Sequence, residues 1–215
     1  MMRFETLASG LGFPEGPVVM PDGSIVVTEI ARGCLTRVTE DGRTSLLAET
    51  GGGPNGAAIG SDGMLYVCNN GGFEWHEGED LRPKGRAEWN HGGSIQRVDP
   101  DSGTVETLYK ACGEIPLRAP NDIVCDGRGG FWFTDHGHRS GRTQDFGAVF
   151  HAREDGTRIR EAAFPLTGPN GIGLSPDGTR LIVAETSSGR LWSYRIEGEG
   201  ELAAVDWPSP TGGDL

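Results

Sequence analysis

The hydrophobic residues of this chain occur in short runs that turn residues separate. Four runs rich in β-branched and aromatic side chains span residues 24–28, 64–68, 131–134 and 181–184. An Asp-Gly pair lies a few residues before each run, and this pair supplies the positive φ that tight hairpins need. The pattern predicts many short β-strands joined by hairpins and argues against a helical bundle.

A short signature recurs at the start of four similar units. Its copies are Pro14-Glu15-Gly16, Pro54-Asn55-Gly56, Pro120-Asn121-Asp122 and Pro169-Asn170-Gly171, and their second residues lie 40, 66 and 49 positions apart. A polar residue follows each signature at the end of the hydrophobic run: Glu29, Asn69, Asp135 and Glu185. A four-stranded propeller blade has about 40–45 residues. An all-β sandwich is the alternative, but four copies in phase favour an all-β fold that is a β-propeller of four-stranded blades.

The repeat also predicts how the chain is organised. Residues 1–215 form a single propeller domain with about four blades, and residues 202–207 complete the fourth unit. Residues 3–8 are expected to form an N-terminal strand that closes the propeller. Residues 211–215 resemble the approach to a fifth signature, so we expect the domain to be truncated.

An insertion at residues 71–93 accounts for the longer second unit. It holds Trp75, His76, Trp89 and His91 among many charged residues. Long loops inside compact domains are usually functional or disordered. The insertion is expected to be either a rim over the channel, with a tryptophan stacked on a sugar-like ring, or a solvated loop whose tryptophans pack locally.

Composition narrows the partners. The chain has 36 Gly and 13 Pro, and 19 Lys and Arg against 31 Asp and Glu give a net charge of −12. An acidic protein repels phosphate backbones, so we expect no nucleic acid and instead a cation or a small molecule. The start of the sequence has no apolar signal segment, and no apolar run approaches the length of a membrane span. These features predict a cytoplasmic protein with four reduced cysteines that binds no membrane.

The repeat has a chemical consequence. A residue at one fixed position of every blade forms a ring around the propeller axis. The signature places Glu15, Asn55, Asn121 and Asn170 in this ring, each expected just before the inner strand of its blade. One carboxylate and three amides make an oxygen-rich cage of the kind that Ca²⁺ prefers. The alternative is that Pro-Asn-Gly serves only as a turn signal, which leaves the Glu of the first copy unexplained.

The ordered motifs resemble the family of the senescence marker protein, gluconolactonase and the luciferin-regenerating enzyme. The resemblance rests on Phe13-Pro14-Glu15-Gly16-Pro17, Ala119-Pro120-Asn121-Asp122-Ile123, Phe131-Trp132-Phe133-Thr134-Asp135 and Pro169-Asn170-Gly171-Ile172 with Ser175-Pro176-Asp177-Gly178. It implies a six-bladed propeller with one divalent cation, Ca²⁺ or Zn²⁺, in the channel. It also implies that Glu15 and Asn170 are metal ligands and that Asn121 contacts substrate and in some relatives the metal. The family's essential Asp, a ligand and acid/base, would lie beyond Leu215, which leaves no catalytic Asp within the chain.

The resemblance implies metal-dependent hydrolysis of a sugar lactone or a similar small cyclic ester. The metal would polarise the carbonyl and activate water. Two alternatives stay open: a non-catalytic propeller with a structural Ca²⁺ and a binding rim, and a hydrolase of another ester class such as organophosphates. Arg118 and Asp135 are candidate substrate-binding residues near Asn121, and His136 and His138 are either a second polar site or a loop cluster.

Overall fold

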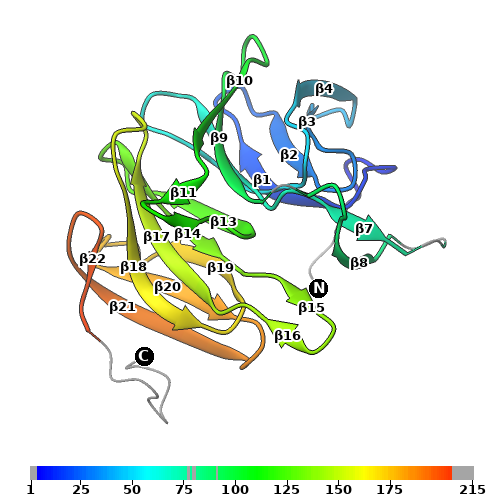
Figure 1. Cartoon of the computed structure of the whole chain (residues 1–215). Helices are drawn as coiled ribbons and strands as arrows, with labels where there is room; N and C mark the ends of the chain where they lie inside the picture. Colours follow the sequence, from blue (N-terminus) through cyan, green and yellow to red (C-terminus); the bar gives the residue numbers. More distant parts are fainter. Residues whose placement is uncertain (1–3, 77, 79–80, 91, 205–215) are drawn as a thin grey trace.

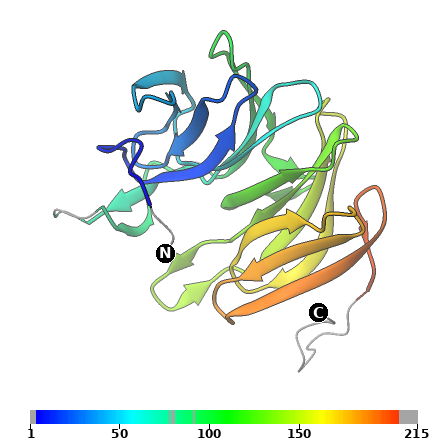
Figure 2. The same ribbon diagram turned by 180° about the vertical axis from the view of Figure 1, so that it is seen from behind.

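The computed structural model describes residues 4–204 except 77, 79, 80 and 91. Every regular element in this part of the chain is a strand, and no described helix could span a membrane. The strands form four four-stranded antiparallel sheets that fan out side by side (Figures 1 and 2). This is the predicted β-propeller architecture.

Each sheet is one blade. The first contains β1 (Pro14–Val19), β2 (Ile25–Glu29), β3 (Cys34–Val38) and β4 (Thr44–Glu49). The second contains β5 (Pro54–Ile59), β6 (Leu65–Asn69), β9 (Ser94–Val98) and β10 (Val105–Tyr109). The third contains β13 (Pro120–Cys125), β14 (Gly130–Asp135), β17 (Gly147–Arg153) and β18 (Ile159–Leu166). The fourth contains β19 (Pro169–Leu174), β20 (Arg180–Glu185), β21 (Arg190–Gly198) and β22 (Glu201–Leu202).

Three two-stranded hairpins extend from these sheets. They are β7 (Phe73–Trp75) with β8 (Pro83–Arg86), β11 (Ala111–Cys112) with β12 (Ile115–Pro116), and β15 (Arg139–Ser140) with β16 (Thr143–Gln144). The first hairpin lies in the insertion at 71–93, so this segment is partly ordered into strands.

The hydrophobic core lies between neighbouring blades. One cluster joins the first and second blades through residues such as Leu35 and Val67. A second joins the second and third through Tyr66 and Phe131, and a third joins the third and fourth through Trp132. Stacking the blades face to face therefore buries apolar side chains that a single sheet would leave exposed.

Two details differ from the sequence prediction. Residues 4–8 form no strand, which corrects the predicted closing strand at residues 3–8; a strand needs a hydrogen-bonded neighbour, and the described residues provide none for this segment. The signatures do not precede the inner strands but form their first residues. Two predicted segments lie outside the described residues. They are residues 205–207 at the end of the fourth unit and residues 211–215, the expected approach to a fifth signature.

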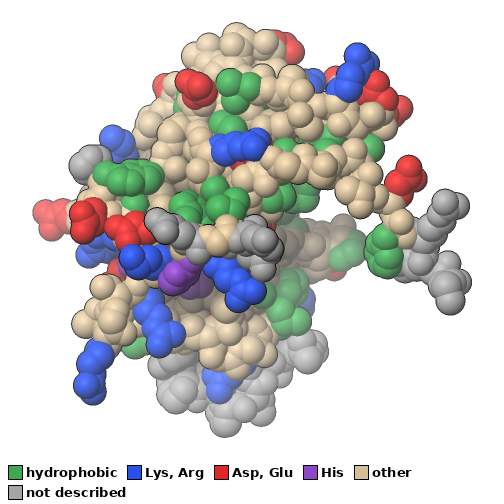
Figure 3. Space-filling view, turned by 90° about the vertical axis from the view of Figure 1, so that its right-hand side faces the viewer, with side chains coloured by type: hydrophobic (Ala, Val, Ile, Leu, Met, Phe, Trp, Pro, Cys, Tyr) green, Lys and Arg blue, Asp and Glu red, His purple; other side chains and the backbone are tan. Residues whose placement is uncertain are grey.

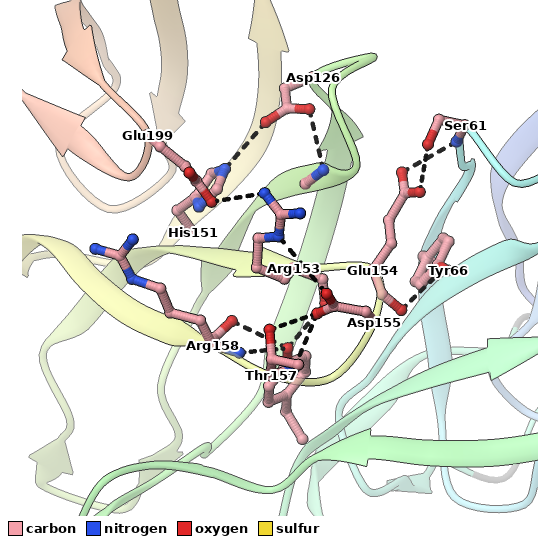
Figure 4. A network of polar contacts seen from close by, with 12 residues as sticks. Ser61, Tyr66, Asp126, His151, Arg153, Glu154, Asp155, Thr157, Arg158 and Glu199 are labelled. Carbon is pink, nitrogen blue, oxygen red and sulfur yellow. Dashed lines mark hydrogen bonds and ion pairs between the residues drawn. The ribbon is translucent and has the colours of Figure 1, made fainter.

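Polar contacts connect the blades at the end of the strands opposite the signatures (Figure 4). The Glu154 carboxylate accepts hydrogen bonds from the backbone N–H and the hydroxyl of Ser61, at 3.0 and 2.6 Å. Arg153 pairs with Glu199 at 3.0 Å. These contacts connect the third blade to the second and to the fourth.

Asp126 and His151 form a half-buried pair within the same network, at 3.1 Å between Oδ2 and Nε2. Burial would raise the pKa of Asp126, but hydrogen bonds from His151 and from the N–H groups of Arg128 and Gly130 outweigh burial and hold that pKa below its usual value. Because the pKa of Asp126 is lower in the folded chain, its ionised carboxylate stabilises the fold. This stabilisation is fully present above the unfolded pKa of about 3.9 and is lost as the pH falls through the folded pKa.

We therefore expect the urea concentration at the unfolding midpoint to decrease when the pH is lowered below about 4. This decrease should be smaller in Asp126→Asn. Equilibrium unfolding at several pH values measures this difference. Glu106→Gln, at an exposed position of β10, is the control and should keep the acid dependence of the unsubstituted chain. An identical acid dependence in Asp126→Asn and the unsubstituted chain would contradict the assignment.

Candidate metal and substrate site

The signature residues begin the inner strands β1, β5, β13 and β19, and an irregularity follows each of them. The pairing with the second strand shifts between Glu15 and Val18, and it shifts at the equivalent positions of the other three inner strands. A bulge changes the direction in which neighbouring side chains point and is frequent next to functional sites. The same local distortion thus presents the signature side chains of all four blades.

These side chains meet in one pocket of about 540 Å³. Glu15, Asn55, Asn121 and Asn170 all line it. Glu15 and Asn170 are exposed, Asn121 is half-buried and Asn55 is buried. The structure therefore brings together the three predicted metal and substrate residues and the fourth member of the predicted ring.

The donor set of this pocket consists of oxygen and amide groups. The described residues contain no group of three or more His, Cys, Asp and Glu side chains arranged to hold a metal. A single carboxylate beside amide oxygens is nevertheless chemistry that fits a hard cation, which takes oxygens from carboxylates, amides and water. The residues present thus fit Ca²⁺, with Glu15, Asn121 and Asn170 as the protein ligands that the sequence predicts.

Hydrogen bonds between blades hold the signature backbone in place. The hydroxyl of Thr28 donates to the carbonyl of Asn55 at 2.5 Å, and that of Thr134 donates to the carbonyl of Asn170 at 2.7 Å. Thr134 also accepts from the N–H of Asp122 at 3.1 Å. The second strands of the first and third blades thus position the signature of the next blade.

Thr134→Val keeps the shape of a fully buried side chain but removes its hydroxyl. Two backbone groups then lose their partner, so we expect a loss of about 1–2 kcal/mol in the free energy of unfolding. The Ca²⁺ affinity should fall several-fold because Asn170 is less firmly placed. Chemical denaturation and calorimetric titration measure the two effects, with Thr107→Val on the exposed face of β10 as the control. Equal stability of the two variants would contradict this role.

The polar residues at the ends of the second strands have a shared structural role. The side chains of Glu29, Asn69, Asp135 and Glu185 are buried and accept hydrogen bonds from backbone N–H groups just before the inner strand of their own blade. Each one therefore closes the loop that leads into the signature.

The structure places the predicted substrate residues Asp135 and Arg118 outside the central pocket. The Asp135 carboxylate accepts from the N–H groups of Arg118 at 2.7 Å, Ala119 at 2.8 Å and Gly137 at 3.0 Å. These bonds occupy the carboxylate, so Asp135 supports the loop that leads into the signature. The Arg118 side chain is exposed and lines an adjacent hollow, which Arg86 and Arg139 also line.

The insertion forms one wall of the pocket. Phe73, Pro83, Lys84 and Arg86 of β7 and β8 line it. Trp75 packs on Phe13, with ring centroids 5.2 Å apart, and this contact joins the hairpin to the segment just before Glu15. Trp89, by contrast, is 55% exposed. The hairpin is thus a rim of the site, as one interpretation of the insertion expects. Neither Trp75 nor Trp89 lines the pocket, and Trp75 packs locally, as the other interpretation expects.

Sequence reasoning missed Asn70 in this pocket. Asn70 is 1% exposed, its Oδ1 accepts the N–H of Gly72 at 2.8 Å, and its Nδ2 has no partner among the described residues. Its neighbour Asn69 carries the repeated polar pattern. Asn70 lies one position later, where Ile30 of the first blade and His136 of the third also line the pocket. The residue types at this position differ, so no shared polar pattern points to it.

His136 and His138 also line the pocket. The Nε2 atom of His138 is buried and has no hydrogen-bond partner among the described residues. Burial lowers the pKa of His138, the nearby charge of Arg86 lowers it further, and Asp135 and Asp145 oppose the shift. His138 is therefore neutral at neutral pH and is available as a hydrogen-bonding group.

Blades around an oxygen-lined pocket define this protein as a β-propeller with a candidate site for a hard cation. A family model described as the SMP-30/Gluconolactonase/LRE-like region matches residues 13–206. The chain belongs to this family, which confirms the resemblance seen in the motifs.

Individual relatives agree with this assignment. The chain is 24% identical to a gluconolactonase from Zymomonas mobilis subsp. mobilis, over 91% of the chain and 56% of that protein. Its fold is similar to that of a gluconolactonase from Xanthomonas campestris, at a TM-score of 0.71, 23% identity and coverage of 93% of this chain and 63% of that chain. It is also similar to the calcium-binding protein regucalcin from Agrobacterium tumefaciens, at a TM-score of 0.66, 17% identity and coverage of 92% and 59%. The chain spans about half the length of the curated relatives it matches.

Proposed function

We propose that the chain carries the cation-binding and substrate-binding face of a metal-dependent lactonase that opens a sugar lactone or a similar small cyclic ester. The observation that carries this proposal is that Glu15, Asn121 and Asn170 meet in one pocket at the start of their inner strands. The names of relatives, gluconolactonase among them, support the reaction class. The regucalcin, described as calcium-binding, supports Ca²⁺ over Zn²⁺.

Each residue has a distinct part. Glu15 supplies the negative charge that holds a divalent cation, and Asn170 supplies a neutral oxygen from the fourth blade. Asn121 is half-buried. Its side-chain amide can accept a hydrogen bond from one group and donate to another, so it can orient a substrate oxygen. When bound here, a divalent cation supplies Lewis-acid polarisation of a carbonyl oxygen.

The test is binding of Ca²⁺ and then of gluconate, the ring-opened product of a sugar lactone, by calorimetry. We expect one Ca²⁺ per chain and gluconate binding that requires it, with Zn²⁺ as the comparison metal. Removal of the cation by a chelator should abolish gluconate binding, and addition of Ca²⁺ should restore it.

Turnover of a panel of lactones and of organophosphate esters, followed with a pH indicator, is the second readout. Chelator-sensitive opening of lactones supports the proposal. Hydrolysis of organophosphate esters without hydrolysis of lactones would show that the substrates belong to another ester class. If the chain binds the cation but neither gluconate nor a lactone, the lactonase proposal is refuted. That result would favour the alternative of a non-catalytic propeller with a structural Ca²⁺.

A further inference from the structure

The charge of the pocket differs from that of the protein. Among the residues that the structure describes, its lining contains three cationic side chains, Lys84, Arg86 and Arg139, and one carboxylate, that of Glu15. The whole chain has 19 basic and 31 acidic residues. The cations come from strand β8 and strand β15, which contact each other across the rim. Lys, Arg and His side chains gather together on this side of the molecule (Figure 3).

The cations are only partly neutralised by the protein itself. Arg139 is exposed and has no carboxylate within ion-pair distance among the residues that the structure describes. Lys84 lies 3.8 Å from Glu74, and both side chains are largely exposed, so solvent screens this pair. Arg86 donates through Nη2 to the carbonyl of Asn90 at 2.6 Å and retains further N–H donors.

Two buried polar atoms of the same pocket, Nδ2 of Asn70 and Nε2 of His138, have no hydrogen-bond partner among the described residues. A buried polar group without a hydrogen bond costs about 1–3 kcal/mol, and a ligand oxygen can remove that cost. Asn70 presents a donor because its Oδ1 is already occupied by Gly72. Thus the pocket combines a cationic rim with buried hydrogen-bonding groups that the oxygen atoms of a ligand would satisfy.

We propose that this pocket recognises a lactone that carries an anionic substituent, a carboxylate or a phosphate, remote from the ring carbonyl. Arg139 and Lys84 hold the anion, and Asn70 and His138 bind hydroxyl or ring oxygens of the substrate. The inference rests on the proposed function and adds the class of substrate. Arg86 is a positioning residue as well as a cation, because it also holds the hairpin through Asn90.

Three ring-opened probes test the inference in the presence of Ca²⁺: gluconate, glucarate and 6-phosphogluconate. They differ only at carbon six, which bears a hydroxyl in gluconate, is the carboxylate carbon in glucarate and bears a phosphate in 6-phosphogluconate. We expect glucarate or 6-phosphogluconate to bind at least about tenfold more tightly than gluconate at low ionic strength, with the preference declining at high salt. The tighter of the two identifies the anion.

At saturating Ca²⁺, the double variant Lys84→Gln/Arg139→Gln should reduce this preference to about twofold. Arg195→Gln is the control, because Arg195 is exposed and pairs with Glu197 far from the pocket. Equal affinity for all three probes, or a preference that survives the double variant, would overturn the inference and leave the lactonase intact. Failure of all three probes to bind would instead refute the proposed function.

Discussion

Glu15→Gln is expected to lower the Ca²⁺ affinity of the chain by about 100-fold or more, because Ca²⁺ affinity follows the charge of its ligands. Glu15 is the single carboxylate among the described residues of the pocket lining, and the other signature residues there are neutral amides. Glutamine keeps the length of the side chain and one oxygen but removes the charge. The positive charges of the cationic rim then repel Ca²⁺, and the negative charge of Glu15 no longer offsets this repulsion. Titration calorimetry with Ca²⁺ measures the loss.

This substitution should leave the fold unchanged. Glu15 is exposed and forms no ion pair with any described residue, so the free energy of unfolding should change by no more than about 0.5 kcal/mol. Glu106→Gln changes the net charge equally at an exposed site on β10 and should keep the full Ca²⁺ affinity. Unchanged Ca²⁺ affinity in Glu15→Gln would remove Glu15 from the metal site.

Much of the fold could be predicted because its determinants are local. Asp-Gly turns and β-branched runs recur in phase. The observed strands β2, β6, β14 and β20 agree with the predicted runs to within one residue at every end. The segment at residues 3–8 has the composition of a strand, but strand formation depends on a partner elsewhere in the fold. Local pattern alone cannot provide that information.

The site was predictable only where it repeats. Glu15, Asn121 and Asn170 share one position of the repeat, so the symmetry of a propeller carries them to one pocket. Asn70 lies one position after a repeated polar residue, but the equivalent residues Ile30 and His136 differ from it in type, and His138 lies outside the repeat. Asp135 shows the converse case, since a polar residue at a strand end resembles a site residue yet recurs in all four blades as a buried acceptor.

The glycine after the signature residue connects the fold to the site. A Cβ atom on Gly56 would lie 2.6 Å from the carbonyl oxygen of Asn121 and 2.6 Å from the Cα of Asp122. These are backbone atoms of the neighbouring inner strand, so they cannot yield without moving β13. In the third copy Asp122 takes the place of the glycine, and its carboxylate accepts the N–H of Ile172 at 3.0 Å. The first two boundaries between blades therefore require direct backbone contact, whereas the third holds a side chain.

Gly56→Ala is accordingly expected to destabilise the chain by about 3 kcal/mol, at the upper end of the cost of overpacking, because β5 and β13 must separate. The separation would also move Asn55 away from Asn121 and weaken Ca²⁺ binding. Gly173→Ala is the matched control: this glycine lies on the inner strand β19, its Cβ would meet no atom within 4 Å, and its φ is not positive. It should be neutral or stabilising by up to about 1 kcal/mol, because alanine restricts the unfolded chain. Urea unfolding compares the two variants, and equal stability would show that the inner strands can separate without cost to the fold.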